Sequence, residues 1–340
     1  MNAMGTTRAR TSGTAGVVLL PWVALGAVYV FWGTTYAAMD VERRHFPIPV
    51  FMGARFTIAG ILLLGAVRLW KGSLGTITRR HLATAAITGC ALLAVANTGI
   101  PFAEERISSG LAAVIVAMAP LVFVVLDRIF RGVQTPRIAV VGLLCGILGI
   151  VILAAPTGAG RVDLIGLGIV LGGTLFWTGG SIYGATAPTP SDPLVFSGLQ
   201  MLSAGLVLSI AGLISGGWGE LRLSELDGTG GFAFGWLVVF GSIAGFTAYS
   251  YVFRVLPLAT VSTYAYVNPV VALLVGWLFL GEGVSGRMLI SSAVILASVA
   301  LVIWSRARGA RPPATEERPV VTKPAAASEP PAAVAAARAD

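Results

Sequence analysis

A succession of apolar segments, each about as long as a bilayer is thick, constrains this chain more than any other feature. A helix needs about 20 consecutive apolar residues to cross the hydrocarbon core of a bilayer. Such segments recur between short polar connections, at 18–38, 48–68, 82–102, 108–128, 135–155, 163–184, 194–215, 233–253, 260–280 and 287–305. The sequence therefore predicts an all-α polytopic membrane protein with ten transmembrane helices.

The composition agrees with a chain that is mostly surrounded by lipid. Hydrophobic residues make up 56% of the 340 residues and charged residues only 11%, whereas soluble proteins carry roughly 25% charged residues. The net charge of +8 comes from basic residues in short loops and tails, without the basic and aromatic patch of a nucleic-acid groove. We therefore expect membrane lipid as a partner and no nucleic acid. The oligomeric state is left open.

Nothing in the sequence indicates a metal site or a cofactor. Cys90 and Cys145 lie inside apolar runs, where cysteine usually serves as a small packing residue. Many glycines are spaced four residues apart, which is typical of closely packed membrane helices, and no strand or loop context supports a nucleotide site. We expect neither a metal nor a cofactor.

The regions outside the apolar segments predict the domain boundaries. Residues 1–17 are expected to form a cytoplasmic N-terminal tail, and the first apolar run is too long for a signal-peptide core. Residues 306–340 are rich in Ala and Pro and are expected to form a disordered cytoplasmic tail. Two halves of five spans lie between the tails, at 18–155 and 163–305.

Lysine and arginine counts predict the orientation, because cytoplasmic loops carry an excess of both. The side that holds the termini has thirteen near the membrane: Arg8, Arg10, Arg68, Lys71, Arg79, Arg80, Arg128, Arg131, Arg137, Arg254, Arg306, Arg308 and Arg311. The other side has six: Arg43, Arg44, Arg106, Arg161, Arg222 and Arg287. We expect both termini in the cytoplasm.

The two halves resemble each other in sequence. At an offset of 145 residues, 31–64 matches 176–209 without a gap at eight positions, which include the Phe-Trp pairs at 31–32 and 176–177. At an offset of 149, the fourth span meets the ninth, where Pro120 matches Pro269. Shared membrane composition is the alternative explanation. Because each half has an odd number of crossings, a true repeat would be inverted, an architecture common in secondary transporters.

Several longer stretches resemble the EamA family of the drug/metabolite transporter superfamily, and its drug/metabolite exporter branch in particular. They are FWGTTY, PVFMGARFTIAGILLL, AEERISSGLAAVIVAMAPL and FTAYSYVFRVLPLATVSTYAYVNPVVALLVGWLFLGE. The resemblance covers about residues 20 to 305. It implies ten helices, a multi-pass location in the inner or plasma membrane, and export of small metabolites, such as amino acids, or of drugs through a central cavity.

The leading hypothesis is therefore a secondary transporter that exports amino-acid-like compounds or drugs by alternating access. Import of a small organic solute is the alternative, because inverted repeats do not set the direction. A membrane-embedded enzyme would need clustered carboxylates, a histidine metal site or a nucleophile beside a base, and none is visible. We expect no enzyme.

Polar side chains inside the apolar segments are the candidates for substrate contact, since such groups are costly when they face lipid. Arg55 is the only Lys or Arg well inside a span, and its repeat partner is Gln200. Arg55 is suited to bind a substrate carboxylate, although snorkelling or a structural bond would equally explain it. The other cavity candidates are Trp32, Tyr36, Asn97, Trp177, Tyr183, Tyr249, Tyr264 and Asn268.

Two prolines at matching repeat positions are candidate hinges. Proline removes a helix hydrogen bond, so Pro120 is expected to kink the fourth span and free the carbonyl of Val116, and Pro269 that of Ala265. Tyr264 and Asn268 are four residues apart and share a helix face, which we assign to the cavity, with Tyr266 on the packing side. A packing kink without a functional role is the alternative.

The acidic residues indicate no site for proton coupling. Every Asp and Glu lies at a span end, in a loop or in a tail, whereas proton-coupled carriers often use a carboxylate or histidine at mid-membrane depth. Glu104 and Glu105 are expected to be solvated loop charges.

Overall fold

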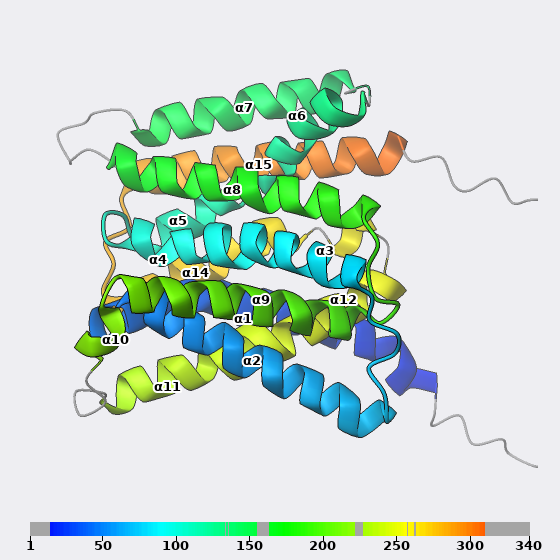
Figure 1. Cartoon of the computed structure of the whole chain (residues 1–340). Coiled ribbons are helices and arrows are strands. Elements are labelled where there is room, and N and C mark those ends of the chain that lie inside the picture. Colours follow the sequence, from blue (N-terminus) through cyan, green and yellow to red (C-terminus); the bar gives the residue numbers. More distant parts are fainter. Residues whose placement is uncertain are drawn as a thin grey trace, which may run out of the picture. The chain divides into compact units, whose positions relative to one another are not determined.

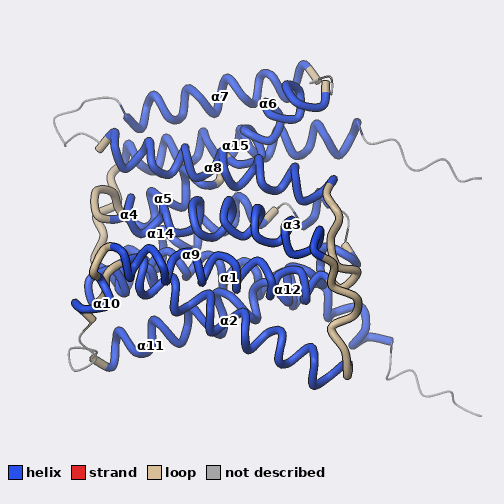
Figure 2. The backbone as a smooth tube through the Cα atoms, viewed as in Figure 1, coloured by secondary structure: helices blue, strands red, loops and turns tan. Residues whose placement is uncertain are grey.

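The computed structural model describes residues 14–132, 134, 136–154, 163–221, 227–256, 258–261 and 263–309. Helices dominate this part of the chain, and it contains no strand (Figure 2). Residues 1–13 and 310–340 lie outside the described residues. The first four residues of the predicted disordered tail, 306–309, are helical and end the last helix, so the prediction is wrong for them, and disorder beyond Gly309 stays a prediction.

The first half of the chain forms five helical passages, two of which are interrupted. The bounds are α1 Thr14–His45, α2 Ile48–Lys71, α3 Arg79–Gly89, η1 Cys90–Asn97, α4 Thr98–Glu104, α5 Ser109–Val116, α6 Ala119–Arg131 and α7 Arg137–Ala154. α3, η1 and α4 follow one another directly, and the η1 segment has π-helical hydrogen bonds. The side chains of Thr78 and Ser108 accept hydrogen bonds from the first turns of α3 and α5 and so fix where those helices begin.

The second half repeats this order. Its helices are α8 Leu164–Thr186, α9 Pro193–Ile214, α10 Gly217–Glu220, α11 Gly228–Trp236, η3 Leu237–Ala244, α12 Gly245–Val255, α13 Leu258–Val261, α14 Tyr264–Leu280 and α15 Gly286–Gly309. The η3 segment is π-helical, like η1, and lies at the corresponding place between α11 and α12. Asp163, Asp192 and Asp227 cap the N-termini of α8, α9 and α11.

Among the described residues, eight helical passages are long and apolar enough to cross a membrane, and two further apolar helices, Arg137–Leu153 and Tyr264–Leu280, are shorter. All ten predicted segments are thus helical, although length and hydropathy support only eight of them as spans. Large apolar side chains such as Leu69, Ile214 and Phe279 are 88%, 83% and 78% exposed. Apolar surface of this extent fits a lipid surrounding.

The helical passages run alongside one another between two ends of the molecule (Figure 1). We call the end where α1 begins and α15 finishes the terminal end. The opposite end, which holds the α1–α2 turn, the α4–α5 turn and the start of α15, is the far end.

The most extensive contact between the two halves is made by α2 and α9, which pack along each other through glycines. A Cβ on Gly53 would come within 2.8 Å of Ser209, and one on Gly198 within 2.7 Å of Leu64. The two contacts are equivalent, because Gly198 corresponds to Gly53 and Ser209 to Leu64 at the offset of 145. A Cβ on Gly60 would likewise lie 2.8 Å from Leu202, while one on Gly205 would collide with Thr57.

A second pair of passages from the two halves, α7 and α15, packs in the same reciprocal way. A Cβ on Gly149 would lie 2.6 Å from Ile295, and one on Gly146 would lie 3.0 Å from the Ser298 hydroxyl. These two contacts are also equivalent, because Ser298 corresponds to Gly149 and Ile295 to Gly146 at the offset of 149.

The two candidate hinge prolines occupy different places in their helices. The fourth passage breaks at 117–118, and Pro120 follows in the first turn of α6. The ninth passage breaks one turn earlier, next to Thr263, and α14 continues through Pro269. The helix breaks therefore do not match between the halves, and the role of the two prolines as hinges stays a prediction.

Candidate functional site

Arg55 is buried in the interior between the two halves. It lies seven residues after the start of α2, and its side chain is 2% exposed. The Nε group donates to the Ser242 hydroxyl of η3 at 3.1 Å, and Nη1 donates to the Asn97 side-chain oxygen of η1 at 3.4 Å. A snorkelling role is excluded by this burial, and both polar partners come from the π-helical segments.

A glycine on η3 makes room for the guanidinium. A Cβ on Gly241 would come within 3.3 Å of Arg55 Nη2 and within 2.8 Å of the Thr35 methyl group. α1, α2 and η3 thus meet at this one position, and any larger side chain would displace the cation.

Four aromatic rings form a second group. Two of them, Phe246 and Tyr249, lie one to two turns after Ser242 on the η3–α12 passage, and the other two come from α1 and α14. Trp32 of α1 lies 5.0 Å from Tyr249, 5.3 Å from Phe246 and 5.5 Å from Tyr264, measured between ring centroids. Tyr249 and Tyr264 also contact each other at 5.8 Å, edge to face. Gly245 provides the space for the Trp32 indole, because a Cβ there would lie 2.5 Å from Nε1. We call these rings the aromatic cluster.

Tyr36 and Asn268 border the aromatic cluster and are each 7% exposed. The Tyr36 hydroxyl interacts electrostatically with Tyr264 and with Glu104. The side-chain oxygen of Asn268 is buried and has no hydrogen-bond partner among the described residues. Its helix presses against α1 at Gly33, where a Cβ would meet the Asn268 carbonyl at 3.2 Å. An amide oxygen left unsatisfied in the interior is available to a ligand.

Three predicted site residues lie apart from this group. The Gln200 side-chain nitrogen donates to the Thr88 hydroxyl at 2.9 Å, both buried, which gives Gln200 a structural bond to α3. Trp177 packs against the main hydrophobic core. Tyr183 is 39% exposed near the end of α8. The structure thus brings together seven candidates: Trp32, Tyr36, Arg55, Asn97, Tyr249, Tyr264 and Asn268.

Sequence reasoning missed two residues of the same face. Ser242 and Phe246 precede Tyr249 by seven and three residues, a spacing that places them on one side of a helix. This shared helix face with Tyr249 could have identified both residues as site candidates from the sequence. Glu104 was also missed: it is 3% exposed, so the prediction of a solvated charge is wrong for Glu104, while Glu105 is exposed as expected.

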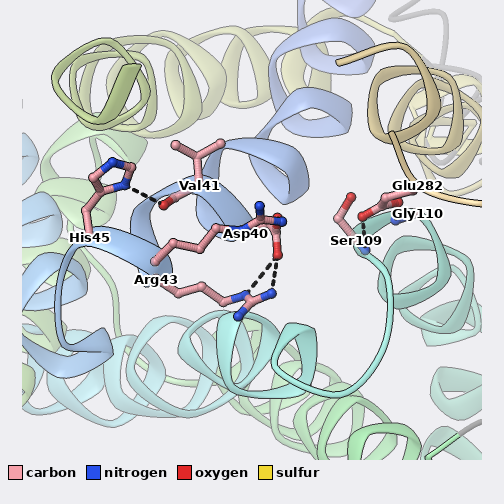
Figure 3. A network of polar contacts seen from close by, with 8 residues as sticks. Asp40, Val41, Arg43, His45, Ser109, Gly110 and Glu282 are labelled. Carbon is pink, nitrogen blue, oxygen red and sulfur yellow. Dashed lines mark hydrogen bonds and ion pairs between the residues drawn. The ribbon is translucent and has the colours of Figure 1, made fainter. Parts of the chain in front are cut away.

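The far end carries a network of charged side chains (Figure 3). Arg43 Nε donates to Asp40 Oδ1 at 2.9 Å, and Arg44 forms an ion pair with Oδ2 of the same carboxylate. Glu282 accepts hydrogen bonds from the backbone N–H groups of Ser109 at 2.7 Å and of Gly110 at 3.2 Å. This carboxylate caps α5 and ties the α14–α15 connection to the α4–α5 turn.

Comparison with known proteins gives two matches to one family. The EamA-like transporter family matches residues 15–155 and again residues 164–304. A protein of Escherichia coli described as the uncharacterized inner membrane transporter YedA is 38% identical over 287 residues, which cover 84% of this chain and 91% of that protein. An uncharacterized transporter of Archaeoglobus fulgidus is 24% identical and covers 84% of this chain and 99% of its own length.

A solved crystal structure shares the fold. It matches with a TM-score of 0.58 over 87% of this chain and 99% of that chain, at 16% sequence identity. At this identity the likeness concerns the arrangement of the helices alone.

Proposed function

The chain belongs to the EamA-like transporter family, and we propose that it is a secondary transporter that exports small carboxylate-bearing metabolites, such as amino-acid-like compounds. Its apolar helices and its relatives, which are named as transporters, make it a multi-pass membrane protein of a transporter family. The proposal adds the direction, the substrate class and the residues that bind it.

The observation that carries the proposal is the guanidinium of Arg55. In the described part of the chain its polar contacts are the neutral groups of Ser242, Asn97 and Met52, and no carboxylate pairs with it. A buried cation without an anionic partner is costly. A substrate carboxylate would supply the missing charge through the bidentate geometry that guanidinium groups favour.

The aromatic cluster supports binding of the rest of such a molecule. Trp32, Tyr249 and Tyr264 present ring faces and polar tips, a combination that is common in small-molecule sites. Asn268 adds an unsatisfied amide oxygen that suits a substrate N–H or ammonium group. We assign the carboxylate to Arg55 and Asn97, and the side chain of the substrate to the rings.

Reciprocal glycine contacts support the proposed ten spans in two inverted repeats, 18–155 and 163–305. α2 runs from the far end to the terminal end and α9 runs back. The contacts of Gly53 and Gly198, and those of Gly60 and Gly205, exchange at one offset. Self-complementary contacts of this kind arise from a two-fold axis. For two antiparallel helices this axis is perpendicular to the helix axes. Transport sites lie at such repeat interfaces.

Two different barriers flank the proposed site. Toward the terminal end an apolar group of Leu25, Val252 and Val261 packs beside Tyr249. Toward the far end lies the charged network of Asp40, Arg43, Arg44 and Glu282. In the proposed cycle the two barriers open alternately. With both termini in the cytoplasm, as the Lys and Arg counts predict, the far end faces outward.

Comparison of the culture medium of expressing and non-expressing cells would test the function. Export predicts that a set of carboxylate-bearing metabolites accumulates in the medium of cells that produce the wild-type protein. The effect is expected to be strongly reduced with Arg55→Gln and to persist with Arg68→Gln, an exposed arginine on the same helix. Depletion of these compounds from the medium would establish import instead, and an unchanged medium would contradict the proposal.

A further inference from the structure

Two carboxylates at the far end, Glu104 and Glu42, are buried and accept no hydrogen bond from the described residues, and Glu104 is the one that lies beside the charged network. Glu104 is the last residue of α4, is 3% exposed, and neither of its side-chain oxygens has a hydrogen-bond partner in the part of the chain that the structure describes. Its neighbour Glu105 is exposed. The turn between α4 and α5 thus directs one acidic side chain inward and the next outward.

The charges around Glu104 are engaged with other groups. Four charged residues act electrostatically on it: Asp40, Arg43, Arg44 and Glu282. The two arginines both bind Asp40, and Glu282 binds the amides that begin α5 (Figure 3). The remaining helices around α4 contribute Tyr36 from α1, and the start of α8 contributes Asp163, which pairs with Arg106 at 3.4 Å. α2 contributes Arg55, which is held by Asn97 and Ser242.

An unpaired carboxylate in such a place is costly, whereas the neutral acid is tolerated. Burial of Glu104 therefore requires a bound proton, and ionisation requires that water reach the side chain. Proton binding to Glu104 and closure of the far end are therefore thermodynamically linked, so that each favours the other.

The position of Glu104 links this equilibrium to the proposed substrate site. Tyr36 lies within electrostatic range of both Glu104 and Tyr264 of the aromatic cluster. Along the passage, Asn97 lies seven residues before Glu104, which is roughly 10 Å of helix. Any movement of α1 away from α4 exposes Glu104 and alters the surroundings of Tyr36 at the same time.

We propose that Glu104 is a proton-binding site whose protonation closes the far end, so that proton release at its carboxyl group accompanies opening. On opening, the O–H bond of Glu104 breaks, the proton passes to water at the far end, and the carboxylate becomes solvated. Closure takes a proton back from that water. The role of this step in the transport cycle rests on the proposed function, but the proton site itself does not.

Infrared spectroscopy of the protein in lipid tests the proton directly. At neutral pH the wild-type protein is expected to show the C=O stretch of a protonated carboxylic acid. Glu104→Gln should remove the contribution of Glu104 and so weaken that band, and the matched control Glu105→Gln should leave it unchanged. Any acid band that remains in Glu104→Gln is expected from Glu42, which is also buried without a hydrogen-bond partner among the described residues. If Glu104→Gln leaves the acid band unchanged, the proposal is overturned. Glu104→Asp, which keeps an ionisable group, is expected to retain a band at a shifted frequency, and loss of the band in that variant would also count against the proposal.

Amide hydrogen exchange tests the link to opening. The ratio of exchange rates between wild type and Glu104→Gln at each pH cancels the intrinsic effect of pH. For amides 105–111 this ratio is expected to rise at least about tenfold as the pH is raised through ionisation of Glu104, since an ionised carboxylate holds the end open. A constant ratio would overturn the link. Neither measurement involves solute flux, so failure of the proposed transport function would be seen separately in the medium comparison.

Discussion

Asn268 combines burial with an unsatisfied oxygen, which is expected to cost stability and to serve the substrate. Replacement by Leu, which is similar in size and apolar, removes the desolvation cost of about 1–3 kcal/mol for an unpaired polar group. We predict that Asn268→Leu leaves the thermal midpoint of the purified protein unchanged or raises it, while solute flux falls.

Thermal unfolding in detergent and flux in vesicles measure the two effects on the same preparation. Gln200→Leu is the matched control, because the Gln200 amide donates to Thr88 and its loss should lower the midpoint. A lower midpoint for Asn268→Leu would show that the amide has a structural partner and would remove it from the site.

At the residue scale, the sequence predicted which residues lie in the interior better than it predicted the role of each. Arg55 was found because a cation inside an apolar helix is costly anywhere except in the protein interior. Gln200 looked equivalent at the repeat position, but its bond to Thr88 depends on how α3 packs against α9. Glu104 and Glu105 are neighbours of the same type, and only the tertiary path of the α4–α5 turn distinguishes the buried one from the exposed one.

At the scale of elements, the glycines between α2 and α9 are expected to carry much of the contact between the halves. A Cβ at Gly205 would collide with the backbone of Thr57, so the helices would have to move apart. We predict that Gly205→Ala lowers the free energy of unfolding by about 1–3 kcal/mol. Gly65→Ala on α2 is the control, since a Cβ there has nothing within 4 Å. Equal thermal midpoints for the two variants would show that this helix contact is not tight.

Helix α8 begins at a cap whose stabilising effect is expected to depend on pH. The backbone N–H of Gly166 lowers the pKa of Asp163, partial desolvation opposes this, and the Ile165 N–H and Arg106 lower it further. Because the folded pKa lies below the unfolded value of about 3.9, the cap is fully effective above that pH. Its contribution is lost as the pH falls through the folded pKa.

The matched variant is Asp163→Asn, which caps a helix comparably but does not titrate. We predict that the thermal midpoint of the wild-type protein falls more steeply than that of Asp163→Asn between pH 5 and about pH 3. Parallel acid profiles would mean that the carboxylate is not a cap in solution.

Helical segments were predictable from the apolar pattern, whereas their internal irregularities were not. Both π-helical segments lie in continuous apolar runs with no proline, so composition gives no sign of them. Pro120 does coincide with a helix break, yet Pro269 lies inside α14, because the chain around Thr263 already provides the turn. A proline marks a weakened place in a helix, and the tertiary contacts decide where the helix breaks.

For the whole molecule, the sequence pattern predicted two halves of five spans, and the reciprocal contacts of α2 with α9 and of α7 with α15 support this arrangement. The sequence pattern did not predict which passages meet at the site. α1, α2, η1, η3 and α14 come together there because two π-helical segments turn Asn97 and Ser242 toward Arg55. Such convergence depends on helix rotation, which apolar spacing leaves undetermined.

Counterflow in proteoliposomes tests the central claim, transport of a carboxylate-bearing solute through the site at Arg55. The solute identified by the medium comparison is loaded inside, and entry of the labelled form is recorded. We predict counterflow with the wild type and with Arg68→Gln, and an apparent affinity about 10- to 100-fold weaker with Arg55→Gln, since a charge-assisted contact contributes about 1.5–3 kcal/mol. Unchanged counterflow in Arg55→Gln would contradict the assigned site, and absence of counterflow in the wild type would contradict the proposed transport.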